Sequence, residues 1–240
     1  LPQAPQQFKQ MIMISGFDRY FQIAPCFRDE DGRADRSPGE HYQLDMEMSF
    51  VEQEDVLKIV EPIFFDLFKE FGNGKKINNT PFPRIKYKDS LEKYGTDKPD
   101  LRNPIELVDV TEIFESDEVK LKIFKEIVSK GGVVKAIPVS NTFSKPRSFF
   151  DGLNNWAISE GANGLAYITF EKTSDKIIGK GPIAKFFSDN ATNKLLKICK
   201  ITEKGSVFFV CNKEKEALNF SGIARQKIAE ELKIIDANSF

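Results

Sequence analysis

An alternating stretch at residues 44–50 is the feature that most constrains how this chain can fold. Its residues read LDMEMSF, so apolar side chains occupy the even positions and polar ones the odd positions. Alternation with period two is typical of a strand with one buried face. A second candidate strand covers residues 20–27, with Phe21, Ile23 and Phe27 at its odd positions. Because a polar loop containing Gly and Pro joins the two stretches, we predict an antiparallel pair.

Helical spacing predicts two helices around this strand pair. Residues 6–15 carry apolar side chains on one side before Gly16, and residues 56–71 carry a longer apolar stripe that Gly72 or Gly74 ends. Residues 74–104 are rich in Pro, Gly, Asn and Lys, which indicates loops and short elements. Beyond them, candidate strands at 133–139, 164–170 and 206–211 alternate with candidate helices at 149–160, 182–187 and 213–232. We therefore expect a second, mixed α+β domain there.

Composition excludes some classes of protein. The 35 basic and 36 acidic residues nearly cancel, which argues against a polycation but leaves room for a local basic strip that contacts nucleic acid. Cys26, Cys199 and Cys211 are scattered without a CxxC spacing, so we expect neither a disulfide framework nor a zinc cluster, and we favour the cytoplasm. No apolar run approaches the ~18 residues of a membrane span. The chain opens at Leu1 without a methionine, so we expect a segment of a longer protein.

The polar side of the strand pair is the candidate site. Period two places Gln22, Arg28 and Glu30 on one side of the first strand, and Gln43, Asp45, Glu47 and Ser49 on one side of the second. An arginine fork suits a phosphate or carboxylate, and a neighbouring carboxylate can accept from an ammonium group. The same residues also fit an ordinary exposed ion pair beside a solvated loop, a reading that the pattern alone leaves open.

Four stretches in the same order resemble one enzyme family. Residues 27–31 (FRDED) with 42–47 (YQLDME) resemble the second signature motif of class II aminoacyl-tRNA synthetases, in which an Arg-x-Glu precedes a loop between two antiparallel strands. Residues 1–9 (LPQAPQQFK) with 15–20 (SGFDRY) are similar to aspartyl-tRNA synthetases. Residues 94–104 (YGTDKPDLRNP) resemble the bacterial form, and residues 164–168 (GLAYI) with 182–186 (PIAKF) resemble its inserted GAD domain.

The resemblance implies a role for each matching residue. Arg28 matches the arginine that holds the ATP α-phosphate and the aspartate α-carboxylate, and Lys9 matches the lysine that faces the aspartate side chain. It implies ATP contacts at Arg28, Asp29, Glu30, Ser37 and His41; aspartate contacts at Gln6, Lys9, Arg28, Gln43 and Asp45; and contacts of Arg33 and Arg36 with the acceptor end of transfer RNA.

Three positions depart from the family pattern. Ala4 stands where the family often has a serine that contacts the substrate ammonium. Ser37 stands where some relatives have a glutamine, and the loop is one residue longer. His41, the only histidine, stands where a phenylalanine usually stacks on adenine. An imidazole can stack as well, but over a smaller area.

The implied fold is α+β: part of a class II antiparallel sheet flanked by helices at residues 1–114, a smaller mixed α+β GAD domain at 115–232, and a return segment at 233–240. The family's third motif, its Mg²⁺ ligands, its dimer-forming first motif and its anticodon-reading domain match nothing in this sequence. We therefore predict that the isolated chain is inactive, although its parent is a homodimeric ligase using ATP and Mg²⁺. Two alternatives remain: a GAD-type binding module without catalysis, and a related enzyme acting on asparagine or ammonia, against which the cation at Lys9 argues.

Overall fold

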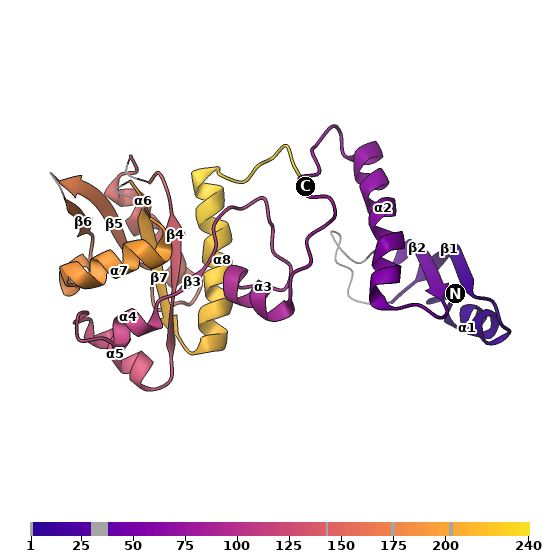
Figure 1. The fold of residues 1–240 in the computed structure, drawn as a ribbon, viewed down its shortest axis with the longest axis horizontal. Coiled ribbons are helices and arrows are strands. Elements are labelled where there is room, and N and C mark those ends of the chain that lie inside the picture. The colour runs from indigo at the N-terminus through magenta and orange to yellow at the C-terminus, as the bar shows by residue number, and fades with distance from the viewer. Residues whose placement is uncertain (1, 30–37, 143, 174–175, 202–203) are drawn as a thin grey trace. The chain divides into compact units, whose positions relative to one another are not determined.

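The fold is drawn in Figure 1 from a computed structural model that describes residues 2–29, 38–142, 144–173, 176–201 and 204–240. The chain forms two compact units, Leu1–Phe82 and Pro83–Phe240. Each unit combines helices with a sheet, and every strand pairing among the described residues is antiparallel. The predicted α+β class is confirmed. In the described part of the chain, no helix has the length and apolar character needed to cross a membrane.

The first unit consists of one strand pair and two helices. These are α1 (Gln6–Ile14), β1 (Arg19–Phe27), β2 (Glu40–Met48) and α2 (Gln53–Phe71). β1 and β2 are antiparallel in a register that sets Gln22 opposite Asp45, which confirms the pairing predicted from the alternation. α2 begins with a capping box, in which the Asp55 carboxylate accepts from the backbone N–H of Glu52. It ends at Gly72, as its apolar stripe predicted.

Helix α2 faces the apolar side of this strand pair but leaves much of that side exposed. Phe21 is 71% exposed and Ile23 is 68% exposed, whereas Ala24 and Cys26 are buried on the other face of β1. The physical reason is that α2 is not packed closely on the strands. A cavity of about 630 Å³ is bordered by Ile59 and Ile63 of α2 and by strand residues that include Phe21.

The second unit is built on a five-stranded sheet with the order β3-β4-β7-β5-β6. The strands are β3 (Val108–Asp109), β4 (Val133–Val139), β5 (Ala166–Thr173), β6 (Lys176–Lys180) and β7 (Ser206–Asn212). The helices are α3 (Tyr87–Tyr94), α4 (Thr111–Glu115), α5 (Lys122–Ser129), α6 (Arg147–Ser159), the 3₁₀ turn η1 (Ala184–Phe186), α7 (Asp189–Cys199) and α8 (Glu214–Leu232).

A hydrophobic cluster covers each face of this sheet. Along β7, Phe209 belongs to the cluster formed with α4, α5 and α7, whereas its neighbour Phe208 belongs to the cluster formed with α6 and α8 (Figure 1). Adjacent residues of a strand point to opposite faces, so a strand buried on both sides becomes a continuous apolar run. This explains why VFFVC in β7 shows no alternation.

Most elements predicted in this unit are confirmed. β4 matches its predicted range, and β5, β7, α6 and α8 match within a few residues. The helix predicted at residues 182–187 is wrong, because only the three residues of η1 are helical there and Pro182 lies in the turn before it. The predicted mixture of short elements before residue 105 contains the eight-residue helix α3.

The segment that follows α3 packs against α8 through a close backbone contact and the hydrogen bonds of a buried arginine. Gly95 has a positive φ of 71°, and a Cβ there would lie 2.4 Å from the Leu218 carbonyl oxygen of α8. About two turns further along α8, Arg225 is only 2% exposed and donates to the backbone carbonyls of Asp100, Asn103 and Ile105 at 3.0, 2.8 and 2.6 Å. The glycine permits the approach and the arginine satisfies the carbonyls that the approach buries.

Candidate functional site

The strand pair of the first unit brings the polar side chains predicted from the alternation onto one face. The register sets Gln22 opposite Asp45 and Ala24 opposite Gln43. Residues directly opposite one another in an antiparallel pair lie on the same face. The face therefore runs along β2 from His41 through Gln43 and Asp45 to Glu47, and the start of α1 adds one residue to it.

Lys9 of α1 is the central cation of this face. Its Nζ lies 2.9 Å from Asp45 Oδ1 and 2.7 Å from Glu47 Oε1. The Lys9 side chain is only 13% exposed and that of Asp45 only 8%. Hydrogen bonds to Glu47 and Asp45 raise the pKa of Lys9 above its usual value, although desolvation acts in the opposite direction. Lys9 is therefore held as an ammonium ion within a partly dehydrated surface.

Arg28 connects to the same face through Gln43. It follows the last residue of β1, where its backbone N–H donates to the Gly39 carbonyl at 2.8 Å and extends the hairpin. A terminal nitrogen of its guanidinium lies 3.4 Å from Gln43 Oε1, and Gln43 Nε2 lies 3.5 Å from Asp45 Oδ1. Both bonds are long, and the contact with Gln43 uses only one of the five N–H donors of Arg28.

Two buried polar atoms on this face have no hydrogen-bond partner among the residues that the structure describes. They are Asp45 Oδ2 and His41 Nδ1. A buried carboxylate oxygen without a partner costs about 1–3 kcal/mol, and more when it is charged. A ligand that carries an ammonium group would remove this cost at Asp45, and a hydrogen-bonding group of a ligand would remove it at His41.

The structure brings together five of the residues predicted for the site: Lys9, Arg28, His41, Gln43 and Asp45. Gln6 is the first residue of α1 and its side chain is exposed; Asp29 is also exposed, just beyond β1. Ala4 lies exposed before α1. The remaining predicted residues, Glu30, Arg33, Arg36 and Ser37, lie outside the described residues.

Glu47 is a residue of this face for which no role was predicted from sequence. It completes the pair of carboxylates around Lys9, and Tyr20, opposite it in the register, donates to Gln22 on the same face. Period two already placed Glu47 beside Asp45. Its partner could not be chosen from sequence, because Lys9 comes from a helix thirty-six residues before Asp45.

Comparison with known proteins identifies the family. The model of the class II tRNA synthetases for D, K and N matches residues 1–234. The chain is 55% identical over all 240 residues to proteins from Pelagibacter ubique and Methylorubrum populi, and 53% identical to one from Rickettsia felis, each named aspartate–tRNA(Asp/Asn) ligase. It spans about 40% of the length of the first two and 39% of the third. Because the family match covers nearly its whole length, the chain belongs to the class II tRNA synthetases of the D, K and N group.

Proposed function

We propose that this chain is the central part of an aspartate–tRNA ligase, which activates L-aspartate with ATP and transfers it to transfer RNA. The observation that carries the proposal is the partly buried ammonium–carboxylate arrangement of Lys9, Asp45 and Glu47, in which one oxygen of Asp45 has no partner among the described residues. Aspartate has one ammonium and two carboxylates. The site offers a carboxylate to the first and cations to the other two.

The proposed arrangement of the substrates follows the order of residues along β2. Asp45 accepts from the substrate ammonium. Lys9 donates to the side-chain carboxylate of aspartate, which takes the place of Glu47 as its partner. Arg28 donates to the α-carboxylate and to the ATP α-phosphate. Strand rise puts His41 about 13 Å from Asp45, so the adenine end of ATP lies toward His41 and the reacting groups meet near Arg28. We propose that Asp29, Glu30 and Ser37 complete the ATP contacts and that Gln6 and Gln43 complete those to aspartate.

The chemistry has two steps. In the first, an oxygen of the aspartate α-carboxylate attacks the α-phosphorus of ATP, the bond to pyrophosphate breaks, and aspartyl-adenylate forms. Arg28 stabilises the negative charge that develops on the phosphoryl oxygens. In the second, a ribose hydroxyl at the acceptor end of the RNA attacks the acyl carbon and AMP leaves. We propose that Arg33 and Arg36 contact phosphates of that RNA end.

We also propose that the rest of the longer protein completes the site. The chain spans about 40% of its relatives' length, and Phe21, Ile23 and Leu44 leave an exposed apolar face on the strand pair. Mg²⁺ would neutralise charge on the ATP phosphates. Among the described residues, no group of three His, Cys, Asp or Glu could hold a metal ion, so we place its ligands in the remaining part. The isolated chain is then inactive, and aspartate-dependent ATP–pyrophosphate exchange by the folded 240-residue chain would contradict this.

For the division of the chain we propose a partial catalytic core at residues 1–114, a GAD insertion at 115–232 and a return segment at 233–240. The five-stranded sheet with its two clusters supports a separately packed insertion, and residues 83–114 pack with it as one compact unit. For the whole protein we propose a cytoplasmic homodimer. A binding module without catalysis is not favoured, because the family match includes both units.

The test is aspartate-dependent ATP–pyrophosphate exchange by the whole protein that contains this chain, with Asp45→Asn beside Asp66→Asn. Asp66 lies exposed on α2 and serves as the matched control. Loss of a charge-assisted bond of about 1.5–3 kcal/mol predicts a KM for aspartate raised about 10- to 100-fold in the first variant. An Asp45→Asn variant with the KM of the control would overturn the aspartate assignment. The transfer step is measured with tRNA-Asp and tRNA-Asn, because the relatives are named for both.

A further inference from the structure

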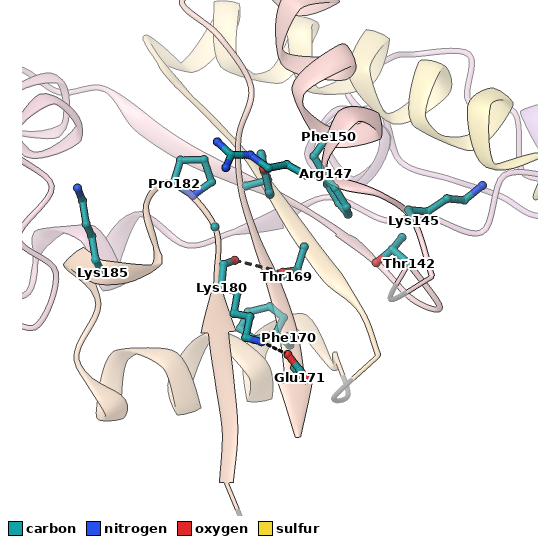
Figure 2. A pocket seen from close by; sticks show the side chains of 12 residues that line it. Thr142, Lys145, Arg147, Phe150, Thr169, Phe170, Glu171, Lys180, Pro182 and Lys185 are labelled. Atoms are coloured by element: carbon teal, nitrogen blue, oxygen red, sulfur yellow. Dashed lines mark hydrogen bonds and ion pairs between the residues drawn. The ribbon is translucent and has the colours of Figure 1, made fainter. Parts of the chain in front are cut away.

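The second unit contains a basic pocket that the ligase chemistry does not use. Its volume is about 540 Å³, and it lies between the start of α6, strand β5 and the turn after β6. Figure 2 shows Arg147 extending from the start of α6 toward Pro182, with Lys145 and Lys185 on opposite sides. Lys180 at the end of β6 is the fourth cation of its lining.

Carboxylates offset only part of this charge. Glu171 pairs with Lys180, and Asp151 lies 3.3 Å from Arg147 Nε. Within the described part of the chain, Lys145 and Lys185 form no salt bridge; each lies instead over a phenylalanine ring, at 5.4 and 5.2 Å from its centroid. Glu231 acts on Lys145 only through the longer-range Coulomb field. The pocket therefore keeps an excess of positive charge.

The rest of the lining strengthens an interaction with an anion. The thirteen-residue helix α6 begins at the rim of the pocket without a side-chain cap, so its first-turn N–H groups add positive potential there. The floor is formed by the aromatic residues Phe150, Tyr167 and Phe170, which are at most 5% exposed. Low-dielectric walls focus the field of the surrounding cations.

The shape of the lining also indicates which part of a ligand is bound. The ring faces of Phe150 and Tyr167 are stacked on each other, with centroids 4.7 Å apart, and both residues are buried. They cannot serve as platforms for stacking bases. The groups that remain accessible are guanidinium and ammonium donors. Donors of that kind bind phosphate oxygens without reading sequence.

We propose that this pocket binds a phosphate group, carried either by the backbone of an RNA or by a free nucleotide or inorganic phosphate. The site is independent of the aspartate site, since all of its residues belong to the second unit. Arg147 supplies a planar fork and the three lysines supply point charges around it. Glu171 weakens binding, because it competes with the phosphate for Lys180.

The first arm of the test titrates inorganic phosphate into the 240-residue chain and follows backbone amides by NMR. Saturable shifts are expected in the first turn of α6 and at residues 180–185. The double variant Lys145→Ala/Lys185→Ala should bind about five- to tenfold more weakly, whereas Glu171→Gln should bind more tightly. The control Lys197→Ala/Lys215→Ala removes the same charge from exposed positions of α7 and α8 and should bind like the parent chain.

The second arm measures binding of a fluorescent RNA at several salt concentrations. If the phosphate belongs to RNA, the pocket variant lowers the slope of log K against log salt by about 2, about 1 for each lysine, and the control does not. If phosphate binds but RNA affinity is equal in both double variants, the ligand is a free phosphate compound. The proposal is wrong if phosphate causes no saturable shifts, or if the pocket variant matches the control in both arms. The fluorescence of Trp156, the only tryptophan, checks that each variant is folded.

Discussion

Replacing Arg225 by methionine should destabilise the second unit by several kcal/mol. The side chain keeps most of its volume, but the backbone carbonyls of Asp100, Asn103 and Ile105 lose their donor in a region where Arg225 is 2% exposed. Three hydrogen bonds from a charged group are worth about 1.5–3 kcal/mol each, or roughly 4–9 kcal/mol together. Burial opposes the charge and lowers the pKa of Arg225. The methionine variant no longer bears the desolvation penalty of the buried ion, which is several kcal/mol. The expected net loss of unfolding free energy is therefore about 2–5 kcal/mol.

Urea unfolding followed by Trp156 fluorescence measures this effect. Trp156 stacks on Phe220 of α8, with ring centroids 5.9 Å apart, so its signal reports on the helix that carries Arg225. A loss of about 3 kcal/mol lowers the midpoint by about 1–2 M urea. Arg225→Lys should fall between the parent and the methionine variant, because an ammonium cannot reproduce the planar fork.

The matched control is Lys227→Met, two residues further along α8. Lys227 is one-third exposed and pairs with Glu231, so its loss should change the free energy of unfolding by no more than about 0.5 kcal/mol. A methionine variant at Arg225 that unfolds with the control would refute the reasoning. It would mean that water satisfies the three carbonyls as well as the guanidinium does.

Two further predictions concern the same unit. Gly95→Ala should destabilise it by well over the ~1 kcal/mol of a left-handed alanine, because its Cβ would overlap a carbonyl of α8. Gly161 has a φ of +85° and open space around it, so Gly161→Ala measures the cost of the backbone conformation alone. Equal losses of stability in urea unfolding would contradict the overlap. At Asp109, desolvation raises the pKa of the carboxyl group. Hydrogen bonds from Lys135 and Thr111 lower it more, so the pKa lies below its usual value of 3.8. A lowered pKa gives stability that is present above the unfolded value and is lost as pH falls through the folded value, so urea midpoints should drop below about pH 4 and drop less in Asp109→Asn; parallel curves would contradict this.

Local patterns predicted the strands and the longer helices because these elements have strong periodicity. The LDMEMSF alternation gave the strand pair, and the apolar stripe before Gly72 gave α2. Two helices were not predicted. Helix α7 has few apolar residues in its first turns, and α4 is only five residues long. The six residues predicted as a helix at 182–187 have the right composition, but only one 3₁₀ turn forms there.

The candidate site could be predicted only as far as each strand determines it. Period two placed Gln43, Asp45 and Glu47 on one side of the second strand and Arg28 on one side of the first, and the resemblance added Lys9. That Lys9 reaches both Asp45 and Glu47 depends on how α1 lies on the sheet, which no local pattern encodes. Arg225 was missed for a similar reason, because its carbonyl partners lie at least 120 residues away in the chain. Arginine is seldom fully buried, so a helix pattern alone does not predict it inside.

The most direct test of the central claim, that the Lys9 face of the strand pair recognises aspartate, is aspartate-dependent ATP–pyrophosphate exchange by the whole protein with Lys9→Ala. Losing the charge-assisted bond from Lys9 to the substrate carboxylate costs about 1.5–3 kcal/mol, which predicts a kcat/KM for aspartate about 10- to 100-fold lower. Lys88→Ala is the control, because Lys88 is 83% exposed on α3, and it should keep the parent's kinetics. Both variants are compared at equal circular dichroism, so that loss of fold is excluded. A folded Lys9→Ala protein that activates aspartate as well as the control does would contradict the account.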